Sequence, residues 1–479
     1  MDDLACHNTK PSLGLRINPN ILDARSLMPP FKTVWRDLCR AFSSSSIQSQ
    51  SDDTGDGAPK RKILIHAINY APELIGCAKY TAELARHLAR QGHQVEVVTA
   101  PPHYPGWYVR KPYKAFAYSS ETLDGVRVSR CPMAMKTDAG GVWRLLAPLS
   151  FGISAVPMLL WRALRFRPDA IMCVEPTLFS APVALLAAKL LGARSLLHVQ
   201  DLEVDAAFGV GHIKGAALKN LAVSGEALLL RGFDHIVTIS FKMRLALAAK
   251  GLEPGAIRVL RNWVDTSAIH PTDSRSNSFR AELKLPEDAY VVLYSGHIGV
   301  KQALDIVVEA ARRLTERSNI YFVIAGAGPS RQSLIAASAD LPNVLHLPLQ
   351  PAERLNDLLG LADLHVLPQH RGAADLVLPS KLSGMLASGR PVVATADPDT
   401  ELFDMLSHAA ILTPSGDPEA LAAAILTASQ TDLSEQAEAG LRLADSMGAK
   451  RILPQFEDLL TAPAERLEEA KNRETAEVG

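Results

Sequence analysis

The sequence predicts an α/β protein with two doubly wound parallel sheets that follow one another along the chain. Short apolar runs of strand length alternate with helical patterns, which is the order of βαβ units. Glycines close the predicted helices and open the loops after the strands. With 479 residues, 47% of them hydrophobic and 21% charged, the chain is long and apolar enough for two such sheets with tails.

Composition also limits the kind of partner. Lys and Arg number 50 and Asp and Glu 51, so the net charge is −1, and any anion site must be local. We therefore expect no nucleic-acid partner. The five cysteines form no CxxC pair, which argues for a reducing compartment and against a disulfide or structural-metal scaffold.

Residues 1–60 are predicted to be a low-complexity N-terminal extension. Asp2 and Asp3 oppose the basic start of a signal peptide, and no apolar stretch follows them. Within 31–42, apolar residues recur at helical spacing beside a basic stripe. This segment is either a short membrane-surface helix, a docking helix, or upstream sequence translated from a mis-assigned start.

The first predicted domain covers 61–270. Its opening strand is KILIHAI (62–68), and the following helix begins at Gly76 and ends before Gly92. Further apolar runs predict strands at 95–100, 168–174, 195–199, 234–240 and 257–262, with helices near 178–191 and 216–231. Short apolar strands in this order predict a parallel sheet that is covered on both faces.

The second predicted domain covers 271–435 and begins in the polar stretch HPTDSRSNS (270–278). Strands are expected at 290–296, 321–328, 363–368 and 391–396, with helices at 302–315, 351–361 and 380–388. Two Rossmann-like sheets would turn their carboxyl-end loops toward a shared cleft, where ligands bind. In the segment 436–479 we expect terminal helices that pack back across the first domain, then a charged tail.

The run from Leu145 to Trp161 carries no charge in 17 residues. It is short for a membrane span and contains two prolines. A span would also place one half of the first sheet on the other side of the membrane from the rest of the domain, so a span is rejected. The run is either a helix covering the sheet or a helix lying in a membrane interface. Because Arg144 precedes it and Arg162, Arg165 and Arg167 follow, contact with anionic lipid is predicted.

Two loops are suited to phosphate. The first is 69–85, where a strand ends and a helix starts at Gly76, so that backbone N–H groups converge on one point. An ordinary βα turn has the same pattern. In 294–304, Gly296 allows close approach, His297 adds a donor, and Lys301 precedes a helix. A lysine and a helix N-terminus together can neutralise a diphosphate without metal.

Two further loops hold candidate binding residues. The turn GAGP (326–329), with Gly326 and Gly328, is a weak nucleotide signal, and a tight turn explains it equally well, since no acidic residue follows at dinucleotide-site spacing. After Pro379, Ser380 is a candidate helix cap with Lys381 in the first turn. A lysine there opposes the helix dipole, so an anionic ligand would rationalise it.

Polar and acidic residues follow the strand at 195–199, namely Gln200, Asp201, Glu203 and Asp205. Such a cluster at a carboxyl strand end indicates a site, although a solvated loop is the alternative. The Asp397-Pro398-Asp399 triplet follows a strand and is interpreted as a turn rather than a metal ligand pair. The sequence contains no GxSxG elbow and no HExxH motif.

Taken together, these motifs resemble the retaining glycosyltransferases of family 4, which have the two-domain GT-B fold, and within them the bacterial colanic acid and exopolysaccharide branch. The resemblance covers about 61–462. It is carried by NYAPELIGCAKYTAELA (69–85), PPHYPGW (101–107), VQDL (199–202), RNWVD (261–265), YSGHIGVKQ (294–302) and ADLVLPSKLSGMLASGRPVVATA (374–396).

The resemblance implies transfer of a sugar from a UDP- or GDP-linked donor with retained configuration, no cofactor and no obligatory metal. By position, the resemblance places Gly76, Gly296, His297 and Lys301 at the donor phosphates and Asp201 near the reacting sugar. The predicted catalytic residues are therefore Asp201 and Lys301, with Lys381 added from its place at a helix start. The predicted donor-binding residues are Gly76, Gly296 and His297, with Gly326, Gly328, Asp375 and Ser380 added from their own motifs.

This sequence departs from the family pattern at one motif. The two glutamates of the family, eight positions apart, would fall at Leu376 and Gly384 and are absent. Asp375, Ser380 and Lys381 are the expected replacements.

The leading hypothesis is therefore a sugar transferase acting on a lipid-linked glycan, peripheral at the cytoplasmic face of the cell membrane. Three alternatives remain at this point. They are a nucleotide-sugar epimerase or hydrolase on the same fold, a non-catalytic nucleotide-sugar-binding protein, which the missing glutamates favour, and a nicotinamide oxidoreductase, which only GAGP suggests.

Overall fold

The computed structural model describes residues 60–73, 76–104, 106, 108–135, 141–176, 179–202, 216–371 and 379–463. The predicted extension up to residue 59 and the site candidate Asp375 lie outside these ranges, as do Glu203 and Asp205.

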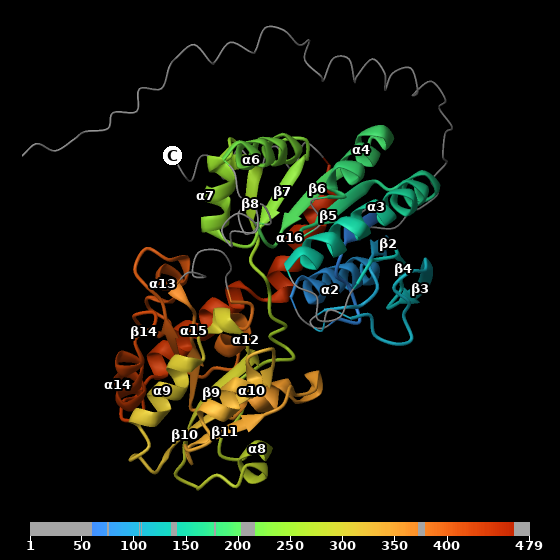
Figure 1. Cartoon of the computed structure of the whole chain (residues 1–479). Helices are drawn as coiled ribbons and strands as arrows, with labels where there is room; N and C mark the ends of the chain where they lie inside the picture. The colour runs from blue at the N-terminus through green and yellow to red at the C-terminus, as the bar shows by residue number, and fades with distance from the viewer. Residues whose placement is uncertain are drawn as a thin grey trace, which may run out of the picture. The chain divides into compact units, whose positions relative to one another are not determined.

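The first sheet has eight strands in the order β3-β4-β2-β1-β5-β6-β7-β8, and all neighbours run parallel except β3 and β4 (Figure 1). The strands are β1 (Lys62–Ala67), β2 (Gln94–Thr99), β3 (Ser119–Leu123), β4 (Val126–Arg130), β5 (Ala170–Val174), β6 (Arg194–Val199), β7 (His235–Thr238) and β8 (Ile257–Val259). The helices that accompany them are α2 (Cys77–Arg90), α3 (Gly141–Phe166), α4 (Ala181–Leu191), α6 (Ala216–Leu230), α7 (Phe241–Ala249) and the 3₁₀ turn η3 (Pro254–Ala256).

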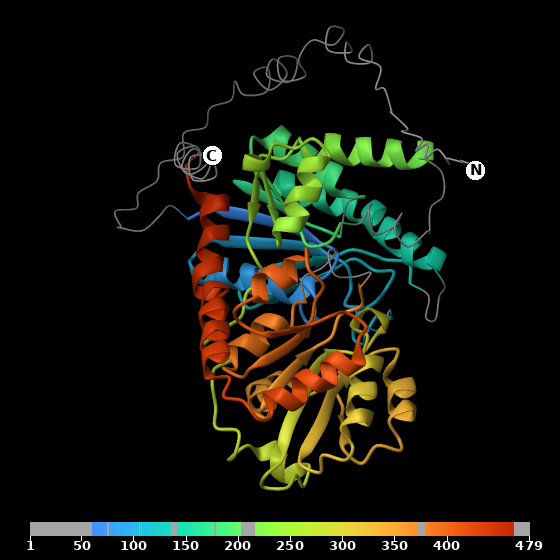
Figure 2. The ribbon, with the colours of Figure 1, turned by 90° about the vertical axis from the view of Figure 1, so that its left-hand side faces the viewer.

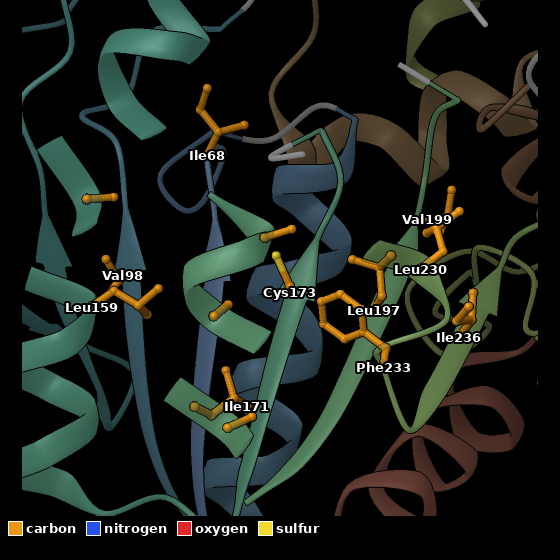
Figure 3. Close-up of a cluster of buried hydrophobic side chains, with 14 of the residues drawn as sticks. Ile68, Val98, Leu159, Ile171, Cys173, Leu197, Val199, Leu230, Phe233 and Ile236 are labelled. Atoms are coloured by element: carbon orange, nitrogen blue, oxygen red, sulfur yellow. The ribbon is translucent and has the colours of Figure 1, made fainter. Parts of the chain in front are cut away.

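Both faces of this sheet are buried, as its apolar strands predict. In β1, Leu64 joins a cluster with residues of α3, α4, α6 and α7, part of which Figure 3 shows. Its neighbours Ile63 and Ile65 point the other way, into a cluster with α2 and the C-terminal helix. Successive residues of a strand face opposite sides, so one apolar run anchors two helix layers.

The β3–β4 hairpin has no counterpart among the predicted elements. Asp124 and Gly125 form its turn with φ of 51° and 80°, the left-handed values that a two-residue hairpin needs. The Asp-Gly pair is a hairpin-turn signal in the sequence. However, both strands contain many charged and polar residues, so their strand pattern is weak. The hairpin extends one edge of the sheet.

The second sheet is fully parallel, with six strands in the order β11-β10-β9-β12-β13-β14. Its strands are β9 (Tyr290–His297), β10 (Ile320–Ala327), β11 (Val344–Leu347), β12 (Leu364–Leu367), β13 (Val392–Thr395) and β14 (Ile411–Thr413). One face carries α9 (Asp305–Arg313), α10 (Arg331–Ala337) and α14 (Pro418–Ala428). The other carries α8 (Ser278–Glu282), α11 (Leu355–Gly360), α12 (Leu382–Ala387), α13 (Glu401–Leu406) and α15 (Ser434–Ser446). Two 3₁₀ turns, η4 (Val300–Gln302) and η5 (Ala352–Arg354), complete this part.

The last helix, α16 (Ala449–Thr461), returns to the first sheet and lies beside its strands (Figure 2). Phe456 is fully buried against Trp263, with ring centroids 5.7 Å apart. The two segments that connect the sheets are also joined to each other, because Val264 N–H donates to Met447 O at 3.0 Å. By contrast, α15 packs against α12 of the second sheet.

The apolar run lies within α3, which covers the first sheet. A buried stripe faces the core at every fourth residue, formed by Ala147, Phe151, Ala155, Leu159 and Ala163. The opposite side is exposed and still apolar, with Leu146, Leu149, Ile153, Trp161 and Leu164. Within the described ranges, Leu146–Phe166 is the single helix stretch long and apolar enough to cross a bilayer. Its buried stripe shows that this helix packs on the first sheet.

One part of the predicted basic flank is wrong. Arg162 is 3% exposed, donates to Ser129 Oγ at 3.0 Å and pairs with Glu96 at 3.5 Å. It therefore fastens α3 to the sheet instead of reaching lipid. Arg165 and Arg167 are exposed.

Candidate active site

The described site candidates on both sheets lie at carboxyl ends of strands, the expected place for a ligand in this architecture. Gly76 closes the loop after β1, and Asp201 follows β6. Gly296 and His297 end β9, the strand between β10 and β12. Gly326 lies at the same level of β10, paired in register with Gly296.

Gly76 occupies the N-cap position of α2 with φ 66° and ψ −149°. A β-carbon there would meet nothing within 4 Å, so the backbone conformation alone requires glycine. The first turn of α2 contains no acidic residue. Its free N–H groups and positive dipole end are therefore available to an anion.

Asp201 and Lys301 come from different sheets, and the charge of Lys301 acts on the Asp201 carboxyl. Burial raises the pKa of the Asp201 carboxyl, and the positive charge of Lys301 opposes this rise. Asp201 also acts on Cys77: burial, Glu73 and Asp201 together raise the pKa of that thiol to about 12. The thiol is thus protonated at neutral pH.

Lys381 extends into the second sheet beside Tyr294. Its Nζ donates to the Tyr294 hydroxyl at 2.6 Å and lies 4.2 Å from the ring centroid. The hydroxyl in turn donates to the carbonyl of His297 at 2.5 Å. Burial lowers the pKa of Lys381 to about 7. The ammonium is therefore held at the end of β9 by one tyrosine.

Tyr294 joins the candidate site through this contact and was not expected from the sequence. It stands in the apolar run of β9, where a buried tyrosine is ordinary core. The available signal was its position two residues before Gly296, which puts its hydroxyl at the strand end.

Gly296 and His297 lie next to this ammonium. A β-carbon on Gly296 would come within 3.5 Å of Lys381 Nζ, so the glycine leaves the lysine accessible from the loop. Burial lowers the pKa of His297, and the charge of Lys381 lowers it further. His297 is therefore a neutral ring at pH 7, able to donate one hydrogen bond but adding no charge.

Gly326 and Gly328 have a packing role. A β-carbon on Gly326 would lie 1.9 Å from Gly296 O, and one on Gly328 would lie 2.1 Å from Ile298 O. Gly326 thus lets the end of β10 lie directly against the end of β9, and Gly328 lets the loop after β10 rest on the loop after β9. The GAGP turn therefore supports the backbone conformation of the loop after β9, which is the candidate phosphate loop.

Ser380 does not cap a helix, contrary to the sequence prediction. Helix α12 begins at Leu382, with Lys381 at the N-cap position, and no side chain caps it. Ser380 instead lines a small pocket. Arg261 and Asn262 line the same pocket from the first sheet's side.

Gln200 exchanges two hydrogen bonds of 3.0 Å with Asn262. Its amide nitrogen is also 3.2 Å from His198 Nε2. Burial lowers the pKa of His198 to about 3, so this ring is neutral. Gln200 therefore links the loop after β6, which contains Asp201, to the loop after β8, which contains Asn262.

The Asp397-Pro398-Asp399 triplet forms a turn, as interpreted. Asp397 accepts from Arg371 Nε at 2.9 Å and from Ser415 N–H at 3.0 Å, and Asp399 has φ 69°. Across the ranges that the structure describes, no three His, Cys, Asp or Glu side chains gather in a way that would hold a metal.

Comparison with known families gives two matches that follow the two sheets. Residues 76–263 match the glycosyl transferase 4-like domain, and residues 289–431 match glycosyl transferases group 1.

Individual relatives agree. The chain is 42% identical over 347 residues to the putative colanic acid biosynthesis glycosyl transferase WcaI of Escherichia coli K12, covering 71% of this chain and 84% of WcaI. It is 28% identical over 374 residues to a D-inositol 3-phosphate glycosyltransferase of Acidothermus cellulolyticus, covering 71% and 76%.

Solved structures share the fold at low identity. Sucrose-phosphate synthase from Thermosynechococcus elongatus has a TM-score of 0.65 at 16% identity, covering 86% of this chain and all of that one. HepE from Anabaena has a TM-score of 0.61 at 15% identity, covering 84% and 100%. The GT-B fold predicted from the sequence is confirmed.

These matches also decide between the alternative enzyme classes. They support a glycosyltransferase in colanic acid or exopolysaccharide-type biosynthesis, and the epimerase, oxidoreductase and non-catalytic alternatives are set aside. With 42% identity across 84% of WcaI and both domain models in order, the chain belongs to the family of GT-B glycosyltransferases that join a glycosyl transferase 4-like domain to a group 1 domain.

Proposed function

We propose that this enzyme transfers a sugar from a UDP- or GDP-linked donor to a lipid-linked glycan, with retention of configuration, at the cytoplasmic face of the membrane. The observation that carries the proposal is the partly buried amine of Lys381 at the end of β9, whose lowered pKa of about 7 shows that its ammonium form lacks a compensating charge. Among the described residues, none of the ion pairs involves Lys381, and its close partner is the neutral Tyr294 hydroxyl. A buried unpaired cation costs stability, and a diphosphate at this place would offset the cost.

The relatives support a nucleotide-sugar donor. HepE has been solved with UDP-glucose, and starch synthase IV from Arabidopsis thaliana has been solved with ADP and acarbose. Both share the GT-B fold with this chain. A diphosphate is common to these ligands, and it is the group that Lys301, Lys381 and the loop after β9 suit.

The chemical step follows from charge. As the bond between the sugar and the donor diphosphate breaks, negative charge grows on the leaving diphosphate. In this proposal Lys301 and Lys381 stabilise that charge, a contribution that is largest where water is excluded.

We place Asp201 on the opposite side, near the sugar ring that becomes electron-deficient. The acceptor oxygen bonds to the anomeric carbon on the face from which the diphosphate leaves, which retains the configuration. An oxygen of the leaving phosphate takes the proton of the acceptor hydroxyl. Neither an enzymic base nor a resident metal forms part of the proposal.

Membrane contact is assigned to the exposed apolar side of α3. Trp161 is 50% exposed and Leu164 65% exposed, and Arg165 lies beside them in sequence. Aromatic and aliphatic side chains next to arginine suit the boundary between acyl chains and anionic headgroups.

The double variant Trp161→Glu/Leu164→Glu should therefore lose most of its co-sedimentation with phosphatidylglycerol vesicles. Turnover with a soluble acceptor should stay within about twofold of the wild-type value, because these two residues are remote from the carboxyl ends of the strands. The matched control is Leu349→Glu, which changes an equally exposed leucine of the second domain. Equal vesicle binding by both variants would remove α3 from the proposal.

A nucleotide-sugar panel tests the function itself. Release of UDP or GDP is measured with each donor, with and without an isoprenoid-diphosphate-linked glycan, for the wild type and Lys301→Ala/Lys381→Ala. We expect one donor to give acceptor-dependent release at least 100-fold above the double variant. Donor turnover that ignores the acceptor would favour a hydrolase, and no release above the variant would reject the proposal.

A further inference from the structure

Glu401, the first residue of α13, does not serve its own helix. That helix is capped by Thr400, whose Oγ1 accepts from Phe403 N–H at 3.2 Å. The Glu401 carboxylate instead accepts from the backbone N–H of Phe241 at 3.0 Å and of Lys242 at 2.8 Å. A side chain of the second domain thus binds the start of α7 in the first.

The N-terminus of α7 is completed by this contact. Ser240 Oγ accepts from Met243 N–H at 3.1 Å, so side chains satisfy the first three N–H groups of the helix. A carboxylate at a helix N-terminus also gains from the helix dipole. Glu401 is 6% exposed, and these donors compensate the burial of its charge.

The same carboxylate holds Arg261. Arg261 Nη1 lies 2.7 Å from Glu401 Oε1, and the guanidinium lies 5.3 Å from the Phe241 ring centroid. The next residue, Asn262, exchanges two hydrogen bonds with Gln200, and Asp201 follows Gln200 directly. A continuous set of short polar contacts therefore runs from α13 to the loop of Asp201.

We infer that Glu401 is a positioning residue for sugar transfer: by holding Arg261 and the start of α7, it places Asp201 relative to the donor loops of the second domain. The inference rests on the proposed role of Asp201. Its physical reason is that Asp201 belongs to the first domain, whereas Lys301 and Lys381 belong to the second. A displacement of about 1 Å between reacting groups can cost about 100-fold in rate.

Glu401→Gln tests this with little change of shape. The amide keeps one acceptor oxygen but turns an NH₂ group toward a donor, so the contact to α7 or to Arg261 must open. We expect kcat to fall 10–100-fold, with the KM for donor within threefold, because the donor loops stay intact.

Asp363→Asn is the matched control. Asp363 also accepts from an arginine, Arg280, at 2.9 Å and from a backbone N–H, Val291, at 2.8 Å. It precedes β12 and therefore lies at the opposite strand end from the site. This variant should lose thermal stability to a similar extent and keep kcat within twofold.

A wild-type kcat in Glu401→Gln, or an equal loss of kcat in Asp363→Asn, would overturn the inference. If Glu401→Gln does not fold, Arg261→Lys decides instead, since it keeps the carboxylate on α7 and removes the guanidinium fork. Lower kcat at unchanged donor KM supports the inference, and unchanged kcat overturns it.

Asp201→Asn separates this inference from the proposal beneath it. Wild-type turnover in Asp201→Asn would reject the role of Asp201 and the inference with it. Loss of turnover in Asp201→Asn, with wild-type kcat in Glu401→Gln, would reject the role of Glu401 alone.

Discussion

Replacing Lys381 with methionine should lower kcat/KM for the donor by about 100- to 1,000-fold and should also stabilise the fold. The activity falls because the leaving diphosphate loses the ammonium held at Tyr294. The stability rises because methionine fills similar space in the same partly buried place without a charge. Opposite changes in activity and stability are what a ligand-binding residue produces and a structural one does not.

The stability gain should depend on pH. The pKa of Lys381 is about 7 in the folded protein against 10.5 for an ordinary lysine, so the unfolded chain binds more protons between these values. Wild-type stability therefore rises with pH from about 7 to about 10, and the penalty is complete below pH 7. The advantage of Lys381→Met should be largest near pH 6 and fade toward pH 10.

Thermal unfolding at pH 6, 8 and 9.5 measures this dependence. Lys301→Met is the matched control, because Lys301 is exposed and its removal should shift the unfolding temperature little at any pH. Equal and pH-independent shifts in both variants would show that Lys381 is not a desolvated cation.

Gly326→Ala should abolish donor binding within the assay range and lower the free energy of unfolding by about 2–5 kcal/mol. The new methyl group would lie 1.9 Å from Gly296 O, a backbone atom that a rotamer change cannot move. Gly326 also has φ 151°, in a region that only glycine adopts readily. The loop after β9 must therefore shift, and Gly296 and His297 shift with it.

Gly192→Ala is the control that separates backbone strain at a positive φ from steric overlap of the new methyl group. Gly192 ends α4 with φ 64°, and a β-carbon there would meet nothing within 4 Å. Its variant should lose about 1 kcal/mol of stability and no activity. Donor affinity measured by titration, together with urea unfolding, gives both quantities, and a Gly326→Ala protein with wild-type affinity would refute the packing argument.

Much of the fold was predictable because parallel strands buried on both faces read as continuous apolar runs. β1 and β5 are such runs, and the loops after them, with Gly76 as an example, follow from the βα order. The β3–β4 hairpin was missed because its strands are polar and lie at the edge. Arg162 was misplaced because a helix pattern does not say which single polar residue turns inward.

The site was only partly predictable, for a similar reason. Lys381, Gly296 and Lys301 could be proposed from the sequence because a lysine at a helix start opposes the helix dipole and glycines open the loops after strands. Tyr294 and Glu401 were not among the candidates, because each enters the proposal through a contact with a residue distant in sequence. The proposed cap at Ser380 was wrong because α12 begins two residues later than the local pattern indicates.

The central question is whether Lys301, Lys381 and the loop after β9 bind a nucleoside diphosphate. Isothermal titration of UDP and of GDP into the full-length protein answers it, with Lys301→Ala/Lys381→Met as the comparison. We predict that one of the two nucleotides binds with a micromolar Kd and that the double variant binds it at least 100-fold more weakly. Failure of both nucleotides to bind the wild type, or equal affinity in the double variant, would contradict the proposed site.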